Sequence, residues 1–176
     1  MDRLVAESQI IRQMSRYALA QDTLDPPLLT SLCCTTGKIV MDVSRHLPDH
    51  PVQYLTPAEL AKMTPQVIGG FTATQHFLGN YFFRWPADGG DGNSGVERVT
   101  VTSSVIADHC IQAEEGGQVE SVTMRAYWYS DVEKEADGQR RVRGFQVERL
   151  VPLDNPGLYV KARVRVAAGL GRKAKG

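Results

Sequence analysis

The 176-residue chain is poor in cysteine, and its three cysteines lie at spacings that form no familiar site. Cys33 and Cys34 are adjacent, Cys110 lies far away, and no C-x-x-C pair occurs. The usual ligand spacing of a zinc site is therefore missing, and we expect no bound metal. An odd cysteine count without a disulfide framework is typical of a reducing compartment, so we expect an intracellular, cytoplasmic protein.

Other signals are also missing from the sequence. No apolar run is long enough to span a bilayer, and the segment Met1–Leu4 lacks the basic-then-apolar pattern of a secretory signal. There is no Asn-x-Ser/Thr sequon, no GxGxxG fingerprint and no P-loop. The run Asp88–Gly95 lacks the ligand spacing of a calcium loop. These absences argue against a membrane partner and against a nucleotide cofactor, and we expect no cofactor.

Charge is balanced overall but unevenly distributed. The chain has 20 basic and 20 acidic residues, and no acidic residue follows Asp154. Six basic residues lie beyond it: Lys161, Arg163, Arg165, Arg172, Lys173 and Lys175. We therefore divide the chain into a domain over 1–154 and a basic C-terminal tail over 155–176. We interpret the tail as a solvated, partly disordered end. Contact with nucleic acid or anionic lipid is the alternative, but the neutral overall balance argues against a nucleic-acid partner.

Helical signals dominate the first part of the chain. Apolar residues at helical spacing predict a helix over 3–21, and Asp25-Pro26-Pro27 can open a short second one. A short strand is expected over 38–43. The sequence Thr56-Pro57-Ala58-Glu59 supplies an N-cap, a proline at the first helical position and the glutamate of a capping box. It predicts a helix over 57–68, which the following two glycines end.

Strand-like stretches make up most of the remaining chain. They cover 72–83, 97–113, 119–133 and 140–152. The turn signals Gly116-Gly117 and Ala136-Asp137-Gly138 precede the last two of them. Helices followed by an antiparallel meander indicate the α+β class, with the helices packed on one face of a curved sheet.

His76 is the residue that most strongly suggests chemistry. It lies in a short, largely apolar strand-like stretch, while the first helical segment carries Tyr17 and Asp22. A neutral imidazole near a carboxylate can move a proton at neutral pH. The structural alternatives are a hydrogen-bonded core histidine, an aspartate that caps a turn and a tyrosine that packs in the core.

Three segments of the chain resemble the SnoaL-like branch of the nuclear-transport-factor-2-like superfamily. Arg16–Asp22 resembles the Tyr and Asp of the family's first helix, and Thr74–Gly79 resembles the strand around the catalytic His of scytalone dehydratase. Val105–His109 lies where that enzyme has a second His. The resemblance covers residues 5–152. It implies a cone-shaped, curved antiparallel sheet with the N-terminal helices packed on its concave face and an internal pocket.

The resemblance also implies catalytic roles for particular residues. His76 would take a proton α to a carbonyl group, Asp22 would orient its imidazole, and Tyr17 would donate a hydrogen bond to the enolate oxygen. His109 or Asp108 would return a proton to the leaving hydroxyl group. Only one of these two neighbours can point inward, because side chains alternate along a strand.

Some positions depart from scytalone dehydratase. Gln21 and Val43 stand where that enzyme has two tyrosines that hold a water against the substrate carbonyl, and Arg125 stands in place of an asparagine. Arg149 matches an arginine that contributes in bile-acid dehydratases of the same branch. We therefore expect Gln21, Arg125, Arg149 and Asp108 to bind a substrate other than scytalone. Surface or salt-bridge positions are the alternative for the two arginines.

The sequence thus favours a cofactor-independent lyase or isomerase. A dehydratase, isomerase or cyclase would act by His/Asp proton transfer on a polyketide-, terpenoid- or steroid-like small molecule. The alternative is a non-catalytic subunit of the same fold that binds a small molecule or serves in assembly. We expect a homo-oligomer, a dimer or trimer. We interpret His46 and His50 as part of a polar loop, and the aromatic residues as core or subunit interface: Tyr81, Phe82, Phe83, Trp85, Tyr127, Trp128 and Tyr129.

Overall fold

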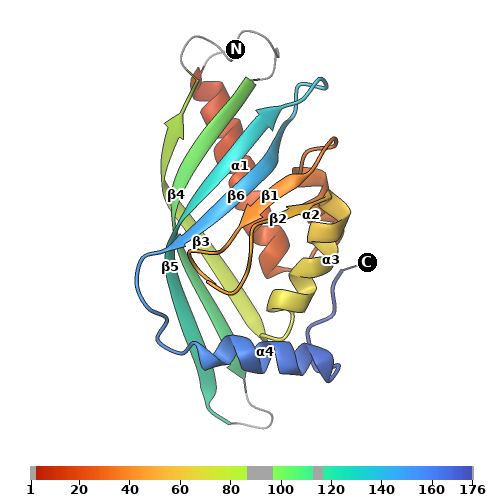
Figure 1. Cartoon of the computed structure of the whole chain (residues 1–176), viewed down its shortest axis with the longest axis vertical. Helices are drawn as coiled ribbons and strands as arrows, with labels where there is room; N and C mark the ends of the chain where they lie inside the picture. The colour runs from red at the N-terminus through yellow and green to blue at the C-terminus, as the bar shows by residue number, and fades with distance from the viewer. Residues whose placement is uncertain (1–2, 87–96, 113–116, 176) are drawn as a thin grey trace.

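The computed structural model describes residues 3–86, 97–112 and 117–175 (Figure 1). The run Asp88–Gly95, which lacks the ligand spacing of a calcium loop, lies outside the described residues, and so does the turn residue Gly116. The elements follow in the order α1 (Arg3–Asp22), α2 (Pro26–Leu32), β1 (Ile39–Asp42), β2 (Gln53–Leu55), α3 (Pro57–Ile68), β3 (Ala73–Arg84), β4 (Glu97–Gln112), β5 (Val119–Lys134), β6 (Arg140–Arg149) and α4 (Gly157–Ala167).

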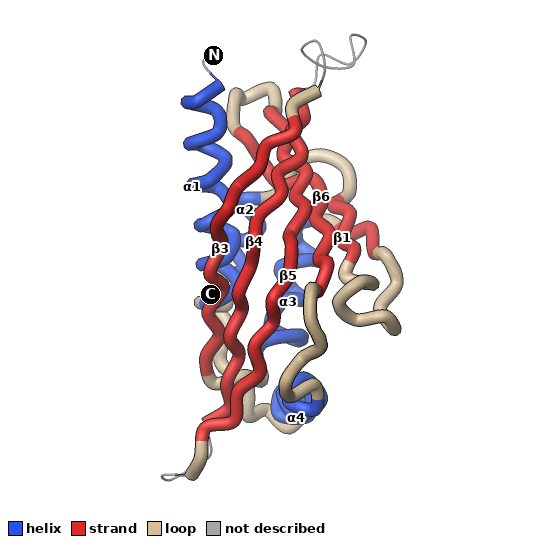
Figure 2. Tube along the Cα trace, turned by 90° about the vertical axis from the view of Figure 1, so that its left-hand side faces the viewer, coloured by secondary structure: helices blue, strands red, loops and turns tan. Residues whose placement is uncertain are grey.

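The strands form one sheet in the order β2-β1-β6-β5-β4-β3. β3 to β6 make an antiparallel meander, whereas β1 pairs parallel to β6. The sheet is curved and open, and α1, α2 and α3 lie on one side of it (Figure 2). The α+β prediction, with N-terminal helices on the concave face, is confirmed. Within the described residues, no helix has the length and apolar character needed to cross a bilayer.

The starts of α2 and α3 follow directly from the local sequence. Asp25 accepts a hydrogen bond from the backbone N–H of Leu28 at 2.9 Å, and Pro26 occupies the first helical position. At α3, Thr56 Oγ1 accepts from the Glu59 N–H at 3.2 Å, and Glu59 Oε2 accepts from the Thr56 N–H at 2.7 Å. The predicted capping box is therefore present.

The core has two parts, one on each side of the site. The larger part lies between α1–α3 and the concave face of the sheet, with Ile10, Met14 and Tyr17 of α1 fully buried. The smaller part lies where α4 crosses the end of the sheet, and Phe71 is fully buried there. Residues of both parts line the candidate site, which lies between them.

The structure corrects the expectation of a partly disordered tail. Residues after Asp154 form α4, in which Leu158, Tyr159 and Ala162 are buried. These three residues recur at helical spacing and pack against Phe71. The sequence misled because six basic residues and no acidic one dominate the composition of this segment and mask its three buried positions.

Candidate active site

Asp22 and His76 form a close pair that joins the end of α1 to β3. Asp22 Oδ1 lies 2.7 Å from Nδ1 of His76, and Asp22 Oδ2 accepts a hydrogen bond from the His76 backbone N–H at 2.8 Å. One carboxylate thus fixes both the ring and the backbone of the histidine. The two residues lie within hydrogen-bond reach as expected, and His76, although not Asp22, lines a pocket.

The ionised Asp22 carboxylate determines which nitrogen of His76 carries a proton. Burial raises the pKa of Asp22, but hydrogen bonds from the His76 ring and backbone and from Thr74 outweigh it, so the pKa lies below its usual value. An ionised carboxylate only accepts hydrogen bonds, so Nδ1 of His76 carries the proton that it donates to Asp22. In this tautomer, Nε2 is the nitrogen that can accept a proton. The His76 side chain is only 6% exposed.

The pocket that contains His76 has a volume of about 270 Å³, close to the lower end of the range for small-molecule sites. It lies between the helices and the concave face of the sheet. Its apolar lining consists of Met41, Val43, Leu47, Leu60, Met63, Val67, Ile68, Met124, Trp128, Phe145 and Val147. Its polar lining consists of Gln21, His46, His50, Gln53, Thr64, His76, His109 and Tyr159.

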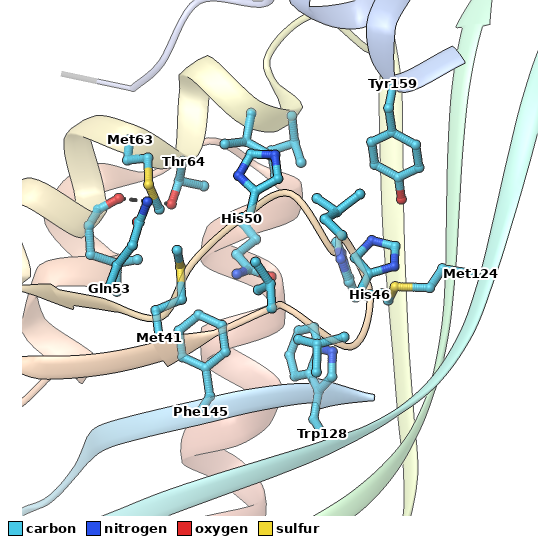
Figure 3. A pocket seen from close by; sticks show the side chains of 18 of the residues that line it. Met41, His46, His50, Gln53, Met63, Thr64, Met124, Trp128, Phe145 and Tyr159 are labelled. Atoms are coloured by element: carbon cyan, nitrogen blue, oxygen red, sulfur yellow. Dashed lines mark hydrogen bonds between the residues drawn. The ribbon is translucent and has the colours of Figure 1, made fainter. Parts of the chain in front are cut away.

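His109 lies next to His76, and Tyr159 in turn lies next to His109. The ring centroids of His76 and His109 are 5.4 Å apart, and the Tyr159 hydroxyl lies 3.5 Å from Nδ1 of His109. Tyr159 points from α4 towards the pocket (Figure 3). Burial and, after it, the neighbouring His76 lower the pKa of His109 to about 3, so this histidine is neutral at physiological pH. Of the two alternatives His109 and Asp108, the structure places His109 inward.

His46 and His50 belong to the loop between β1 and β2, as expected, but the loop turns both of them to the pocket lining. His46 is 6% exposed, and its Nδ1 has no hydrogen-bond partner among the described residues. Burial, then the charge of Arg149, lowers its pKa to about 4. The segment between β1 and β2 folds inward over the pocket (Figure 3). Its Pro, Asp and Ser content resembles a solvated loop, and no periodic apolar pattern reveals the inward side.

Tyr17 is buried but is absent from the pocket lining. Its ring packs edge-on against Trp128 and Phe145, which themselves line the pocket. Its hydroxyl is buried and finds no hydrogen-bond partner within the part of the chain that the structure describes. Burial, with Cys33 adding to it, raises its pKa well above the usual value. Tyr17 therefore lies behind the pocket wall, and the direct contact with substrate that we expected is not seen in this arrangement.

The remaining predicted site residues divide between the two faces of the sheet. Asp108 and Arg125 are exposed on the convex face, so their expected role in substrate binding is wrong. Asp108 instead accepts a hydrogen bond from Thr123 at 2.7 Å. Gln21 lines the pocket as expected. Arg149 is absent from the lining, but it lies on the same face of β6 as Val147, and its charge acts on the buried His46.

The curved sheet with helices on its concave face is the fold of solved structures that include a member of the nuclear-transport-factor-2-like family from Streptomyces avermitilis. Residues 2–145 match the family described as the SnoaL-like domain. The chain therefore belongs to the SnoaL-like family, and the resemblance noted in the sequence is confirmed. A search of curated proteins gives no significant match.

Solved structures show the same fold. The Kfla4162 protein of Kribbella flavida is 20% identical with a TM-score of 0.74, covering 92% of this chain and 99% of that one. A candidate scytalone dehydratase from Novosphingobium aromaticivorans is 17% identical with a TM-score of 0.65, covering 85% and 87%. A type 2 hexachlorocyclohexane dehydrochlorinase, LinA, is 16% identical with a TM-score of 0.62, covering 85% and 88%.

Proposed function

We propose that this protein is a cofactor-independent lyase or isomerase that moves a proton within a largely apolar pocket. One observation carries the proposal: the 2.7 Å contact between Asp22 and His76, at a position where the histidine ring lines the pocket. A buried carboxylate that fixes the tautomer of an imidazole is the arrangement that general base catalysis requires.

In the proposed reaction, Nε2 of His76 takes a proton from the carbon α to a carbonyl group. The electron pair of the C–H bond moves towards the carbonyl oxygen and gives an enolate, while the histidine becomes an imidazolium. Asp22 stabilises that positive charge without accepting the proton. Such positioned base catalysis contributes on the order of 10²–10⁴-fold to the rate.

His109 and Tyr159 supply the second half of the proposed chemistry. A neutral imidazole can donate a hydrogen bond to a developing enolate oxygen, and the low pKa of His109 keeps it neutral. Its contact with the Tyr159 hydroxyl can orient the ring. For a β-hydroxy ketone, collapse of the enolate would expel hydroxide, and the proton held by the His76 imidazolium would convert it to water. For an isomerisation, the proton would return to another carbon.

The pocket also supports a class of substrate. Its polar groups are spread along a mostly apolar space: His46 and Tyr159 lie near one end, Gln53 and Thr64 near the other, and His50 between them (Figure 3). Such a lining suits a compact ring system with oxygen substituents, as in polyketide-, terpenoid- or steroid-like compounds. Two of the similar structures bear the names of a dehydratase and a dehydrochlorinase, and both names denote eliminations.

The proposal is tested by α-proton exchange, which needs no knowledge of the natural substrate. The protein is incubated with β-tetralone or cyclohexanone in deuterium oxide, and proton NMR follows the loss of the α-proton signal. We expect exchange above the buffer rate, a loss on the order of 10²–10⁴-fold in His76→Ala and a smaller loss in Asp22→Asn. Circular dichroism of each variant confirms folding.

A matched control is Arg125→Ala, which changes an exposed residue on the convex face. This variant should keep the full exchange rate. If wild type and folded His76→Ala exchange both ketones at the same rate, the catalytic proposal fails. The protein would then be a binding or assembly subunit of the same fold.

A further inference from the structure

We infer that Arg172, which follows α4 near the C-terminus, is a positioning residue for the Asp22–His76 pair. This inference rests on the proposed function, because the pair is the proposed catalytic base. The basic tail would then have a role that its composition does not suggest. After α4 the tail runs back to the middle of the molecule, where it supports the Asp22–His76 pair.

The guanidinium of Arg172 joins three elements that meet at the site. Nη1 donates a hydrogen bond to the backbone carbonyl of Asp22 at 2.7 Å, at the end of α1. Nη2 donates to the carbonyl of Ile68 at 3.3 Å, at the end of α3, and to Thr74 Oγ1 at 3.2 Å, in β3. Arg172 therefore fixes the helix that carries Asp22 relative to the strand that carries His76.

The backbone of the same segment is anchored as well. The N–H of Arg172 donates to the carbonyl of Gly69 at 2.7 Å, and the N–H of Lys175 donates to the carbonyl of Leu24 at 2.8 Å. Lys175 also forms an ion pair with Asp25 at 3.5 Å. These contacts hold the segment after α4 against the ends of α1 and α3, so the guanidinium does not depend on its own side-chain contacts for its position.

The position of Asp22 explains why such support is needed. Asp22 is the last residue of α1, where the negative end of the helix dipole disfavours a carboxylate and where backbone carbonyls lack partners within the helix. Arg172 satisfies the carbonyl of this residue and brings a positive charge to the same helix end. The charge of Asp22 in turn acts on the guanidinium, opposing the effect of burial, which lowers the pKa of Arg172.

Thr74 links Arg172 to the carboxylate itself. Its hydroxyl oxygen accepts from Arg172, and its hydrogen bond to Asp22 helps to lower the pKa of that carboxyl group. Thr74 and His76 are two residues apart in β3 and so lie on the same face of the strand. The resulting chain runs from Arg172 through Thr74 and Asp22 to Nδ1 of His76. Loss of Arg172 should therefore weaken the contact between Asp22 and Nδ1 of His76.

NMR of the free protein, labelled at histidine, tests this without any substrate. The readout is the Nδ1 proton of His76, which is protected and shifted downfield by its hydrogen bond to Asp22. We expect this signal in wild type and in Lys173→Gln, which changes the neighbouring exposed charge. In Arg172→Gln the signal should broaden or move upfield, and Arg172→Lys should restore it in part.

Exchange of β-tetralone gives the second readout. In Arg172→Gln, kcat should fall on the order of tenfold while KM changes little, because the residue acts on the base and touches no substrate. If Arg172→Gln lowers the melting temperature but leaves both the Nδ1 signal and kcat at the wild-type values, the residue is only a structural tie and the inference is wrong.

A second variant keeps the test decisive if Arg172→Gln does not fold. Thr74→Val removes the hydroxyl between Arg172 and Asp22 but leaves the two backbone contacts of the guanidinium in place. The same change of the Nδ1 signal is expected, and an unchanged signal overturns the inference. If wild type exchanges no ketone at all, the proposed function fails, whereas the NMR result still decides the role of Arg172.

Discussion

Acidification should destabilise this protein in a pH range set by two pocket histidines. Burial is the first cause that lowers the pKa of His46 to about 4 and that of His109 to about 3, against the usual value of 6.5. The unfolded chain therefore binds protons at these residues below about pH 6.5, while the folded protein does not. Stability that is fully present at neutral pH is lost as the pH falls through this window towards the two folded pKa values.

The magnitude follows from the size of the two pKa shifts. At about pH 5, each histidine removes roughly 2 kcal/mol from the free energy of unfolding, so that the two together remove roughly 4 kcal/mol. This is a large part of the roughly 5–15 kcal/mol that stabilises a typical domain. The lowered pKa of Asp22 acts in the same direction, but only below its usual value of 3.8, so it does not contribute in this range.

Urea unfolding at a series of pH values measures the effect. The midpoint should drop steeply between about pH 6.5 and pH 5 with little change in slope m. The pH dependence gives the number of protons that the chain takes up on unfolding. This number should fall by about one in His46→Asn and in His109→Asn, whatever each change does to stability at neutral pH. A wild-type stability that stays constant over this range, or variants with an unchanged pH dependence, would refute the assignment of two buried neutral histidines.

Further predictions concern chelation, the C-terminal tail, the N-cap of α3 and the convex face of the sheet. Prolonged chelation should leave ketone exchange unchanged, and a loss that zinc restores would contradict the mechanism. A chain that ends at Pro156 loses the buried Leu158 and Tyr159, so calorimetry should show at least about 4 kcal/mol less stability or no folded protein; a melting temperature equal to that of wild type would oppose this. Thr56→Ala should cost about 1 kcal/mol in urea unfolding through the lost cap, and no loss would mean that the cap is dispensable. Arg125→Ala should keep the exchange rate, and a large loss would place this residue in catalysis after all.

Local signals were sufficient for most of the fold. The capping box at Thr56 and the two prolines after Asp25 place helix starts correctly, because caps depend on neighbours within a single turn. The long strands agree with the expected stretches, although β6 ends at Arg149 rather than at 152. The short strand β2 and the parallel pairing of β1 with β6 were not predicted, because both depend on partners distant in the sequence.

The candidate site shows even more clearly which features local sequence predicts and which depend on distant contacts. The sequence alone singled out His76 and Asp22, because short motifs resembling a known family lie around both residues. It also determined the α+β class, since the period of the apolar pattern changes from helical to strand-like along the chain. It could not assign sides: Asp108 and His109 differ by one position, and only the register of β4 decides which of them faces the pocket.

Only the tertiary structure brought His46, Tyr159 and Arg172 to the site. His46 comes from a loop that folds inward, Tyr159 from a helix that closes the end of the sheet, and Arg172 from the segment that follows this helix. None of them lies in a local pattern that marks function, because each acts through contacts with residues far away in the chain. A sequence specifies its local structure through neighbours, whereas a pocket depends on surfaces that meet only when the whole chain has folded.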